Sequence, residues 1–348
     1  MSRPPADPSQ TVLVTGGSGY LAGWVIAEAL NAGYSVRTTL RTPSREAEVL
    51  ESVGRISHHT DRLSFAAADL TKDDGWAEAV DGCRYVLHVA SPFPPEQPKN
   101  PDDLIVPARE GTLRVLKAAL DAGAERIVVT SSVAAIDRPA GEAPGRVLTE
   151  ADWADGANEK NSPYGRSKTI AEQAAWALVE ERGQKGRLAT VNPGAIIGPL
   201  ISDDRSFSLQ LIERMLKGEP AVPKLGFSMV DVRDIARLEL AAMTTPEAGG
   251  SRFIGVARFA WMSEVAKTLR DQLGSEARKV PKRTAPNFLI RAMALFDGSV
   301  KSIVPNLGVK TEYSHDHATA VLGWQPRPLP ESVVDCARSI LAHDAQHR

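Results

Sequence analysis

A glycine-rich turn near the N-terminus is the feature that most restricts how this chain can fold. Residues 11–15 (TVLVT) predict a buried strand, and residues 21–31 predict a helix. Between them, Gly17, Gly19 and Ala22 match the G-x-G-x-x-G/A spacing of dinucleotide-binding turns. Glycine allows a tight turn and the close approach of a pyrophosphate, whose charge the exposed N–H groups of the helix end can hold. The spacing alone is equally compatible with an ordinary turn, but its place between a strand and a helix predicts a dinucleotide site.

The alternation of strand and helix continues through the first two thirds of the chain. Strands are predicted at residues 35–40, 63–68, 84–90, 126–131 and 187–192, with helices at 45–51, after Lys72, at 102–122 and at 162–182. This order is typical of an α/β protein with a doubly wound parallel sheet, the Rossmann fold. After residue 193 we expect an irregular mixture of loops and helical patches. Ligands of such sheets bind beyond the carboxyl ends of the strands, so this last third is expected to face the substrate.

Composition excludes several other classes of protein. The 348 residues are 43% hydrophobic, and 41 Lys and Arg balance 43 Asp and Glu to a net charge of −2. A net charge this small gives no electrostatic attraction for nucleic acid or an anionic membrane. The sequence also contains no apolar run of about 18 residues, the length that could span a bilayer. Cys83 and Cys336 cannot form a disulfide framework, and residues 1–10 do not resemble a secretory signal, so we expect a cytoplasmic protein. The histidines lack metal-ligand spacing, and no metal is predicted.

The end of the second predicted strand indicates which dinucleotide is bound. NAD sites place an Asp or Glu there to bind the ribose 2′-hydroxyl. Here the strand ends in Thr38, Thr39, Leu40 and Arg41, so a guanidinium stands where an acid is expected. A guanidinium matches the geometry of a phosphate, which favours NADP(H) over the alternative of an ordinary surface arginine. Asp69, after the third strand, is better placed to hydrogen-bond the adenine amino group.

A tyrosine–lysine pair is the clearest indication of chemistry. Tyr164 and Lys168 are four residues apart in a predicted helix, so they share one helical face. The pKa of a free tyrosine is near 10, and we expect the Lys168 ammonium to lower the pKa of Tyr164 into the range useful for general acid–base catalysis. The fifth strand ends in Ser131 and Ser132. Ser132 is the preferred partner for a substrate oxygen, and Ser131 is the alternative.

Together these features resemble the extended short-chain dehydrogenase/reductase superfamily. Within it, the chain is similar to the dihydroflavonol-reductase-like branch, which includes plant dihydroflavonol and cinnamoyl-CoA reductases and microbial ketone and aldehyde reductases. The similarity rests on residues 15–24 (TGGSGYLAGW), 88–92 (HVASP), 164–168 (YGRSK), 192–194 (NPG) and 229–236 (MVDVRDIA). It implies that the cofactor is bound by Gly16, Gly19, Tyr20, Leu21, Arg41, Asp69, Leu70, Val89, Ala90, Ser91, Lys168, Pro193, Ala195 and Ile196.

The predicted domain organisation follows the same scheme. Residues 11–193 are expected to form the NADP-binding Rossmann domain, and residues 194–348 a smaller C-terminal substrate-binding portion. Within the latter, residues 229–257 are expected to return to the Rossmann domain. Candidate substrate contacts are Phe93, Asp137, Ser208 and Phe227. The expected partner is a small carbonyl or alcohol substrate, and the expected oligomeric state is a monomer or a homodimer.

We therefore expect an NADPH-dependent carbonyl reductase that transfers a hydride to a ketone or an aldehyde, with Tyr164 as the general acid. Ala108 stands where the sugar epimerases of the superfamily carry Asn, which weakens the alternative of a nucleotide-sugar epimerase or dehydratase. Asp137 stands where plant dihydroflavonol reductases carry an amide, and residues 161–164 (NSPY) differ from the cinnamoyl-CoA reductase signature. The sequence is also compatible with a 3β-hydroxysteroid dehydrogenase-like enzyme and with a non-catalytic NADP(H)-sensing protein.

Overall fold

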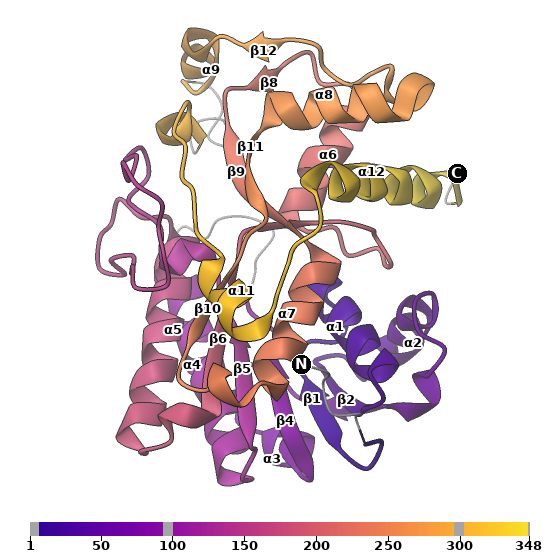
Figure 1. Cartoon of the computed structure of the whole chain (residues 1–348), viewed down its shortest axis with the longest axis vertical. Helices are drawn as coiled ribbons and strands as arrows, with labels where there is room; N and C mark the ends of the chain where they lie inside the picture. The colour runs from indigo at the N-terminus through magenta and orange to yellow at the C-terminus, as the bar shows by residue number, and fades with distance from the viewer. Residues whose placement is uncertain (1–6, 93–99, 296–302, 347–348) are drawn as a thin grey trace.

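A seven-stranded parallel sheet organises the computed structural model, which describes residues 7–92, 100–295 and 303–346 (Figure 1). The strand order is β10-β6-β5-β4-β1-β2-β3, and every pair is parallel. The strands are β1 (Thr11–Val14), β2 (Ser35–Leu40), β3 (Leu63–Ala67), β4 (Cys83–His88), β5 (Arg126–Thr130), β6 (Leu188–Pro193) and β10 (Arg252–Gly255). The predicted doubly wound sheet is confirmed. Its order reverses between β1 and β4, so a ligand crevice is expected at their carboxyl ends.

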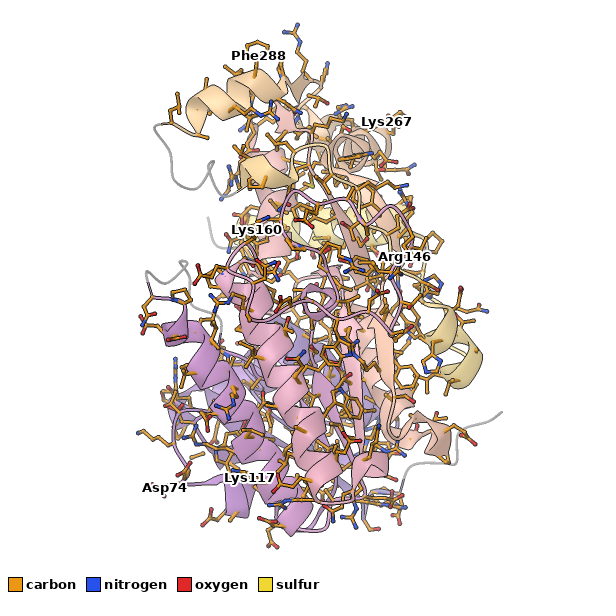
Figure 2. The ribbon with its side chains drawn as sticks, turned by 90° about the vertical axis from the view of Figure 1, so that its left-hand side faces the viewer. Asp74, Lys117, Arg146, Lys160, Lys267 and Phe288 are labelled. Carbon is orange, nitrogen blue, oxygen red and sulfur yellow. The ribbon has the colours of Figure 1, made fainter. Side chains whose placement is uncertain are left out.

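Helices cover both faces of this sheet, as the apolar character of the strands predicts. One face carries α1 (Tyr20–Asn31), α2 (Glu46–Gly54) and α7 (Val232–Thr244), and the other carries α3 (Trp76–Val80), α4 (Asp102–Asp121) and α5 (Pro163–Glu181). Alternate residues of β1 serve the two layers: Val12 and Val14 pack with the first set and Leu13 with the second. Figure 2 shows α4 and α5 side by side, with Lys117 toward the end opposite Phe288. Within the described ranges, no helix is long and apolar enough to cross a membrane.

The last third contains more strands than the sequence predicts. β7 (Ala195–Ile197), β9 (Gly226–Asp231) and β11 (Arg258–Trp261) form a second sheet, and β8 (Val222–Pro223) pairs with β12 (Thr284–Ala285). The helices are α6 (Phe207–Lys217), α8 (Met262–Leu273), α9 (Asn287–Met293), α11 (Asp316–Leu322) and α12 (Leu329–Gln346). Short 3-10 turns occur at Pro43–Arg45, Thr60–Arg62, Val133–Ala135, Lys185–Arg187, Pro246–Ala248, Gly274–Ala277 and Val304–Asn306.

The prediction of loops and helical patches was wrong for these strands, because they lie outside the regular strand–helix alternation that reveals the equally short strands of the first sheet. Two later segments pack with the seven-stranded sheet and its helices: α7 packs beside α1, and β10 pairs with β6 at the edge of the sheet. The domain boundary at residue 193 stays a prediction.

Candidate functional site

The glycine turn lies at the carboxyl end of β1, where the crevice of the sheet begins. Gly16 has a φ of +75°, and a Cβ there would lie 2.9 Å from the Cβ of Ala90. A Cβ on Gly17 would lie 2.4 Å from the hydroxyl of Thr38. Gly19 is the N-cap of α1 and has no side chain to cap it, so the first N–H groups of the helix face the turn. The turn therefore has the backbone shape and the donors that a dinucleotide phosphate needs.

The ends of β1, β2 and β4 hold this turn in place. The Gly16 amide donates to Thr39 Oγ1 at 3.0 Å, and the Ala90 amide donates to Thr15 Oγ1 at 3.0 Å. The same Thr15 hydroxyl lies 2.9 Å from Nδ1 of the buried His88. Burial lowers the pKa of His88 to about 3, so its imidazole is neutral at physiological pH. The turn is thus fixed by neutral hydrogen bonds before any ligand arrives.

The other predicted cofactor residues lie along the same edge of the sheet. Arg41 follows β2 directly and is exposed, and Asp69 lies just beyond β3. Hydrogen bonds from the amide and the hydroxyl of Thr71 lower the pKa of Asp69, and the charge of Arg41 adds to this effect. Arg41 and Asp69 are therefore neighbours. The remaining predicted residues follow β3 or β4, end β6 or lie in β7: Leu70, Val89, Ala90, Ser91, Pro193, Ala195 and Ile196. Their contacts with a cofactor stay predictions.

Helix α5 presents the predicted catalytic pair from its first two turns. Ser162 caps the helix by accepting a first-turn amide at 3.0 Å, and Pro163 occupies the first helical position. Tyr164 is half-buried and Lys168 is buried, and both lie on one face of the helix. The Lys168 ammonium lies 6.0 Å from the centre of the Tyr164 ring and donates to the Thr130 carbonyl at 3.4 Å. The pair is thereby held against the carboxyl end of β5.

The effect of Lys168 on Tyr164 differs from the expected one. Protein atoms around the Tyr164 hydroxyl raise its pKa by desolvation, and a hydrogen bond with Ser132 opposes that rise. Burial also lowers the pKa of Lys168 to about 8, against the charges of Glu172 and Glu239. The pKa of Tyr164 is therefore raised rather than lowered as expected, because desolvation of the phenol is the largest effect on it. Tyr164 therefore stays protonated at neutral pH and can serve as a proton donor.

The two candidate serines at the end of β5 have different partners. Ser131 is buried, and its hydroxyl donates to Glu172 at 2.5 Å. The Ser132 hydroxyl accepts from the Ala134 amide at 3.1 Å and lies near enough to the Tyr164 hydroxyl to lower its pKa. This geometry favours Ser132 over Ser131 as the hydroxyl beside a reacting oxygen. The catalytic roles themselves stay predictions.

Sequence analysis misses Glu172, which extends the line of Tyr164 and Lys168 by one further turn of α5. Its buried carboxylate forms an ion pair with Arg252 of β10 at 2.7 Å. The Arg252 guanidinium also lies 3.7 Å from the centre of the Trp153 ring. Further donors to Glu172 come from β6 and the end of β5: Thr190 at 2.8 Å, Asn192 at 2.8 Å and Ser131 at 2.5 Å. The four-residue spacing from Lys168 is the signal that could have indicated a shared helical face.

Glu239 of α7 is a second buried acid that the sequence does not reveal. Its Oε1 accepts from the Thr130 hydroxyl at 2.6 Å, and Thr130 is also the residue whose carbonyl accepts from Lys168. Its Oε2 has no hydrogen-bond partner among the described residues. Burial raises the pKa of Glu239 to about 7, against the hydrogen bond from Thr130 and the charge of Lys168.

In the part of the chain that the structure describes, no group of three or more His, Cys, Asp or Glu side chains could hold a metal ion.

Two of the predicted substrate contacts come from the first two thirds of the chain. Phe93 lies outside the described residues. Asp137 follows the turn after β5 and lies near Tyr313, a buried side chain from the last third. Burial raises the pKa of Asp137, so this contact joins two groups that hold their protons more strongly than usual.

The other two predicted contacts are neighbours in the last third. Phe227 of β9 packs edge-on against Phe207 at the start of α6, with ring centres 6.5 Å apart. Ser208 is the next residue of α6 and is half-buried. The structure thus brings β9 and the first turn of α6 together, and their contact with substrate stays a prediction.

A glycine turn at the switch point of a parallel sheet lies at the same edge as a tyrosine, a lysine and a serine beyond β5, two strands away. This combination defines a class, the dinucleotide-dependent oxidoreductases of Rossmann type. Residues 12–255 match the NAD dependent epimerase/dehydratase family. The chain belongs to this family, and the predicted membership of the extended short-chain dehydrogenase/reductases is confirmed.

Individual relatives match three quarters of the chain or more. A cinnamoyl-CoA reductase of Medicago truncatula is 34% identical over 333 residues, which cover 94% of this chain and 95% of that protein. A dihydroflavonol 4-reductase of Zea mays is 31% identical over 77% of this chain and 75% of its own. Among solved structures, Gre2 of Candida albicans in complex with NADPH is 26% identical, with a TM-score of 0.79 over 96% of this chain and 99% of that chain. The similarity is thus to reductases.

Proposed function

We propose that the protein is an NADPH-dependent carbonyl reductase that converts a ketone or an aldehyde to an alcohol. The observation that carries this proposal is that the Tyr164 hydroxyl lies near the Ser132 hydroxyl, with Lys168 beside them, beyond the end of β5. A protonated phenol and a neighbouring hydroxyl are two donors that can converge on one carbonyl oxygen. The glycine turn at the end of β1 supplies a dinucleotide site at the same edge of the sheet.

The residues of this edge fit NADP(H). The glycine turn and the first N–H groups of α1 would hold the pyrophosphate. Arg41 would hold the 2′-phosphate, because it follows β2 where NAD sites carry an acid. The complex of Candida albicans Gre2 with NADPH supports this choice of cofactor. When bound, the nicotinamide supplies the hydride that reduces the substrate carbon.

The side chains of α5 and β5 would handle the oxygen and its proton. Tyr164 and Ser132 would hydrogen-bond the carbonyl oxygen and stabilise the negative charge that it develops. Tyr164 would then give its proton to that oxygen. The proton is available because the raised pKa of Tyr164 keeps the phenol protonated at neutral pH. Lys168, with a pKa of about 8, is largely an ammonium at pH 7 and would offset the charge left on Tyr164.

Reduction is favoured over epimerisation, and small carbonyl compounds over larger substrates. Ala108 replaces the Asn of sugar epimerases, and Arg41 tells against NAD. The two plant relatives are named as reductases. Asp137 and the NSPY sequence at 161–164 nevertheless depart from the patterns of dihydroflavonol and cinnamoyl-CoA reductases. We therefore propose a simple aldehyde or ketone as substrate rather than a flavonoid or a coenzyme A ester.

Tyr164→Phe tests the role of the phenol. The assay follows NADPH oxidation with aldehydes, aryl ketones, β-ketoesters, flavanonols, steroids and cinnamoyl-CoA, with NADH in parallel. We expect turnover with NADPH in the wild-type protein and a loss of about 10²–10⁴-fold in kcat in the variant, since the proton donor is removed. The Kd of NADPH, measured by fluorescence titration, should change little.

Tyr85→Phe is the matched control, because Tyr85 is buried in β4 and also loses only a hydroxyl. It should keep the wild-type kcat. Full activity of Tyr164→Phe would refute the role of the phenol. Binding of NADPH without turnover over the whole panel would instead favour a non-catalytic NADP(H)-sensing protein.

A further inference from the structure

Residues 199–206 (PLISDDRS) form a strap between β7 and α6 that reaches back to the glycine turn. Near its end, Asp204 Oδ2 accepts the amide hydrogen of Tyr20 at 2.8 Å. Tyr20 is the first residue of α1, so this amide is one of the helix-end donors expected to face a pyrophosphate. The same carboxylate oxygen would lie 3.9 Å from a Cβ on Gly19. A negative group of the chain itself therefore sits at the positive end of α1.

Contacts on both sides of Asp204 hold the strap in this position. Before Asp204, three side chains bind the backbone of the strap, one from α1, one from the residue after α2 and one from α12. Trp24 donates to the Pro199 carbonyl at 3.1 Å, Arg55 donates to the Ile201 carbonyl at 3.0 Å, and Ser339 accepts the Leu200 amide at 2.8 Å. After it, Arg205 forms ion pairs with Asp344 at 2.5 Å and with Glu213 at 2.6 Å. The strap is thus anchored to elements from both ends of the chain.

We infer that Asp204 is an internal competitor for the cofactor: its carboxylate occupies the Tyr20 amide that the pyrophosphate needs, and it must leave this position when NADP(H) binds. One amide hydrogen is not available to two acceptors at full strength. Two negative groups at one helix end also repel each other, because the site can neutralise only a limited charge. The inference rests on the proposed function, and it makes the strap a determinant of cofactor affinity.

The neighbouring acid on the strap has a different environment. Asp203 is exposed, as Asp204 is, but it pairs with His343 of α12 at 2.6 Å. The charge of Asp204 instead acts on Arg45. The pKa of Arg45 is raised mainly by the hydrogen bond between Arg45 and Glu48, and the charge of Asp204 adds to this effect. Arg45 lies shortly after Arg41 in the chain, near the end of β2. The two adjacent carboxylates therefore allow a matched comparison, with equal charge and different partners.

NADPH binding to the full-length protein tests this inference without any turnover. Fluorescence titration is carried out on the wild-type protein and on Asp204→Asn, Asp204→Ala and Asp203→Asn. We expect Asp204→Asn to lower the Kd of NADPH about two- to fivefold at low salt, as removal of a charge from a helix end implies. Asp204→Ala should gain at least as much, because Asn can still accept from the Tyr20 amide. The gain should shrink at high ionic strength.

Asp203→Asn should leave the Kd unchanged, since the backbone of the strap keeps its other anchors. In stopped-flow mixing, the gain of the Asp204 variants should appear in the association rate constant, because the carboxylate no longer has to be displaced. An unchanged or weaker affinity in both Asp204 variants, or an equal gain in Asp203→Asn, would overturn the inference. Wild-type binding of NADPH without turnover would count against the proposed reaction alone, whereas no binding at all would overturn both.

Discussion

At the scale of single residues, burial moves three ionisable side chains of the candidate site toward their neutral forms. It raises the pKa of Tyr164, lowers the pKa of Lys168 to about 8 and raises the pKa of Glu239 to about 7. The common cause is the loss of hydration, which costs a charged form more than a neutral one. A site of this kind keeps a proton on the phenol at neutral pH, which suits an acid that must protonate an alkoxide.

Glu239→Gln should stabilise the folded protein more strongly as the pH rises. The folded-state pKa of Glu239, about 7, lies above its ordinary value of 4.5. Between these values the folded state keeps a proton that the unfolded state loses, so Glu239 lowers stability as the pH increases. Gln is neutral throughout and can still accept from Thr130. We expect the stability difference between variant and wild type to grow by at most about 3 kcal/mol from pH 4.5 to pH 8.

Urea unfolding at several pH values measures this difference. The contribution of His88 is present in both proteins and cancels in the comparison, whereas Lys168 loses the charge of Glu239 in the variant, so its contribution changes together with that of Glu239. A difference that stays constant with pH would show that Glu239 titrates normally in the folded state. The activity of the variant is not needed for this test.

At the scale of elements, α5 works as a rigid carrier because its inner face is bound to three strands. Tyr164, Lys168 and Glu172 lie along one line of the helix, and Glu172 joins it to the end of β5, to β6 and to β10. Arg252 also donates to the backbone carbonyls of residues 150 and 152, in the segment that precedes α5. Buried charges of this kind cost hydration, but each one here has several partners. The result is a fixed position for the first turns of α5.

Arg252→Met should destabilise the protein by about 3–5 kcal/mol, because it leaves the Glu172 carboxylate buried without its ionic partner. Adding Glu172→Gln should recover a large part of this loss, since a neutral amide replaces the unpaired charge. Denaturant unfolding of the two single variants and the double variant measures the coupling.

The matched control for this cycle is Arg182→Met. Arg182 pairs with Asp121 at 2.6 Å on the surface of α4 and α5, where both partners remain substantially exposed. Its loss should cost less than about 1 kcal/mol, because water and salt screen the pair. Equal losses in Arg182→Met and Arg252→Met would contradict a special role for the buried pair.

At the scale of the whole molecule, the two parts of the chain share one hydrophobic core. This core extends from Val12 of β1 through α7 to Ile340 of α12. Arg327, just before α12, binds the carboxylate of Asp234 in α7 at 3.0 Å. The elements that carry the glycine turn are therefore packed against elements that follow residue 230. Stability of the nucleotide-binding layers depends on the last third.

A fragment that ends at Pro193 should not form a cooperatively folded domain. It lacks α7, which packs on β5, β6 and α1, and β10, which pairs with β6, so apolar side chains of the sheet would face water. We expect a broad, non-sigmoidal thermal transition by circular dichroism, against a sharp one for the full chain. A sharp transition of the fragment would show that residues 11–193 are an independent domain.

Local patterns predict most of the first two thirds correctly. Each predicted strand and helix from residue 11 to residue 193 has a counterpart in the structure, because strands of a doubly covered sheet and their helices have strong periodic signals. The glycine turn and the Tyr164–Lys168 spacing are equally local. The short strands of the last third and the direction of the Tyr164 pKa are missed, since pairing and burial depend on neighbours that are distant in the chain.

The sequence by itself determined the Rossmann architecture, the position of the dinucleotide turn and the helical face shared by Tyr164 and Lys168, because each depends on residues within a few turns of one another. Only the tertiary structure placed Asp204 on the Tyr20 amide across 184 residues and Glu239 beside Thr130 across 109 residues. The first contact follows from how the strap before α6 reaches the glycine turn, and the second from how α7 packs on β5 and β6. A periodic sequence pattern does not predict contacts between residues so far apart in the chain. Which charged groups lie at the site, and how far they are shielded from water, is therefore determined only by the folded structure.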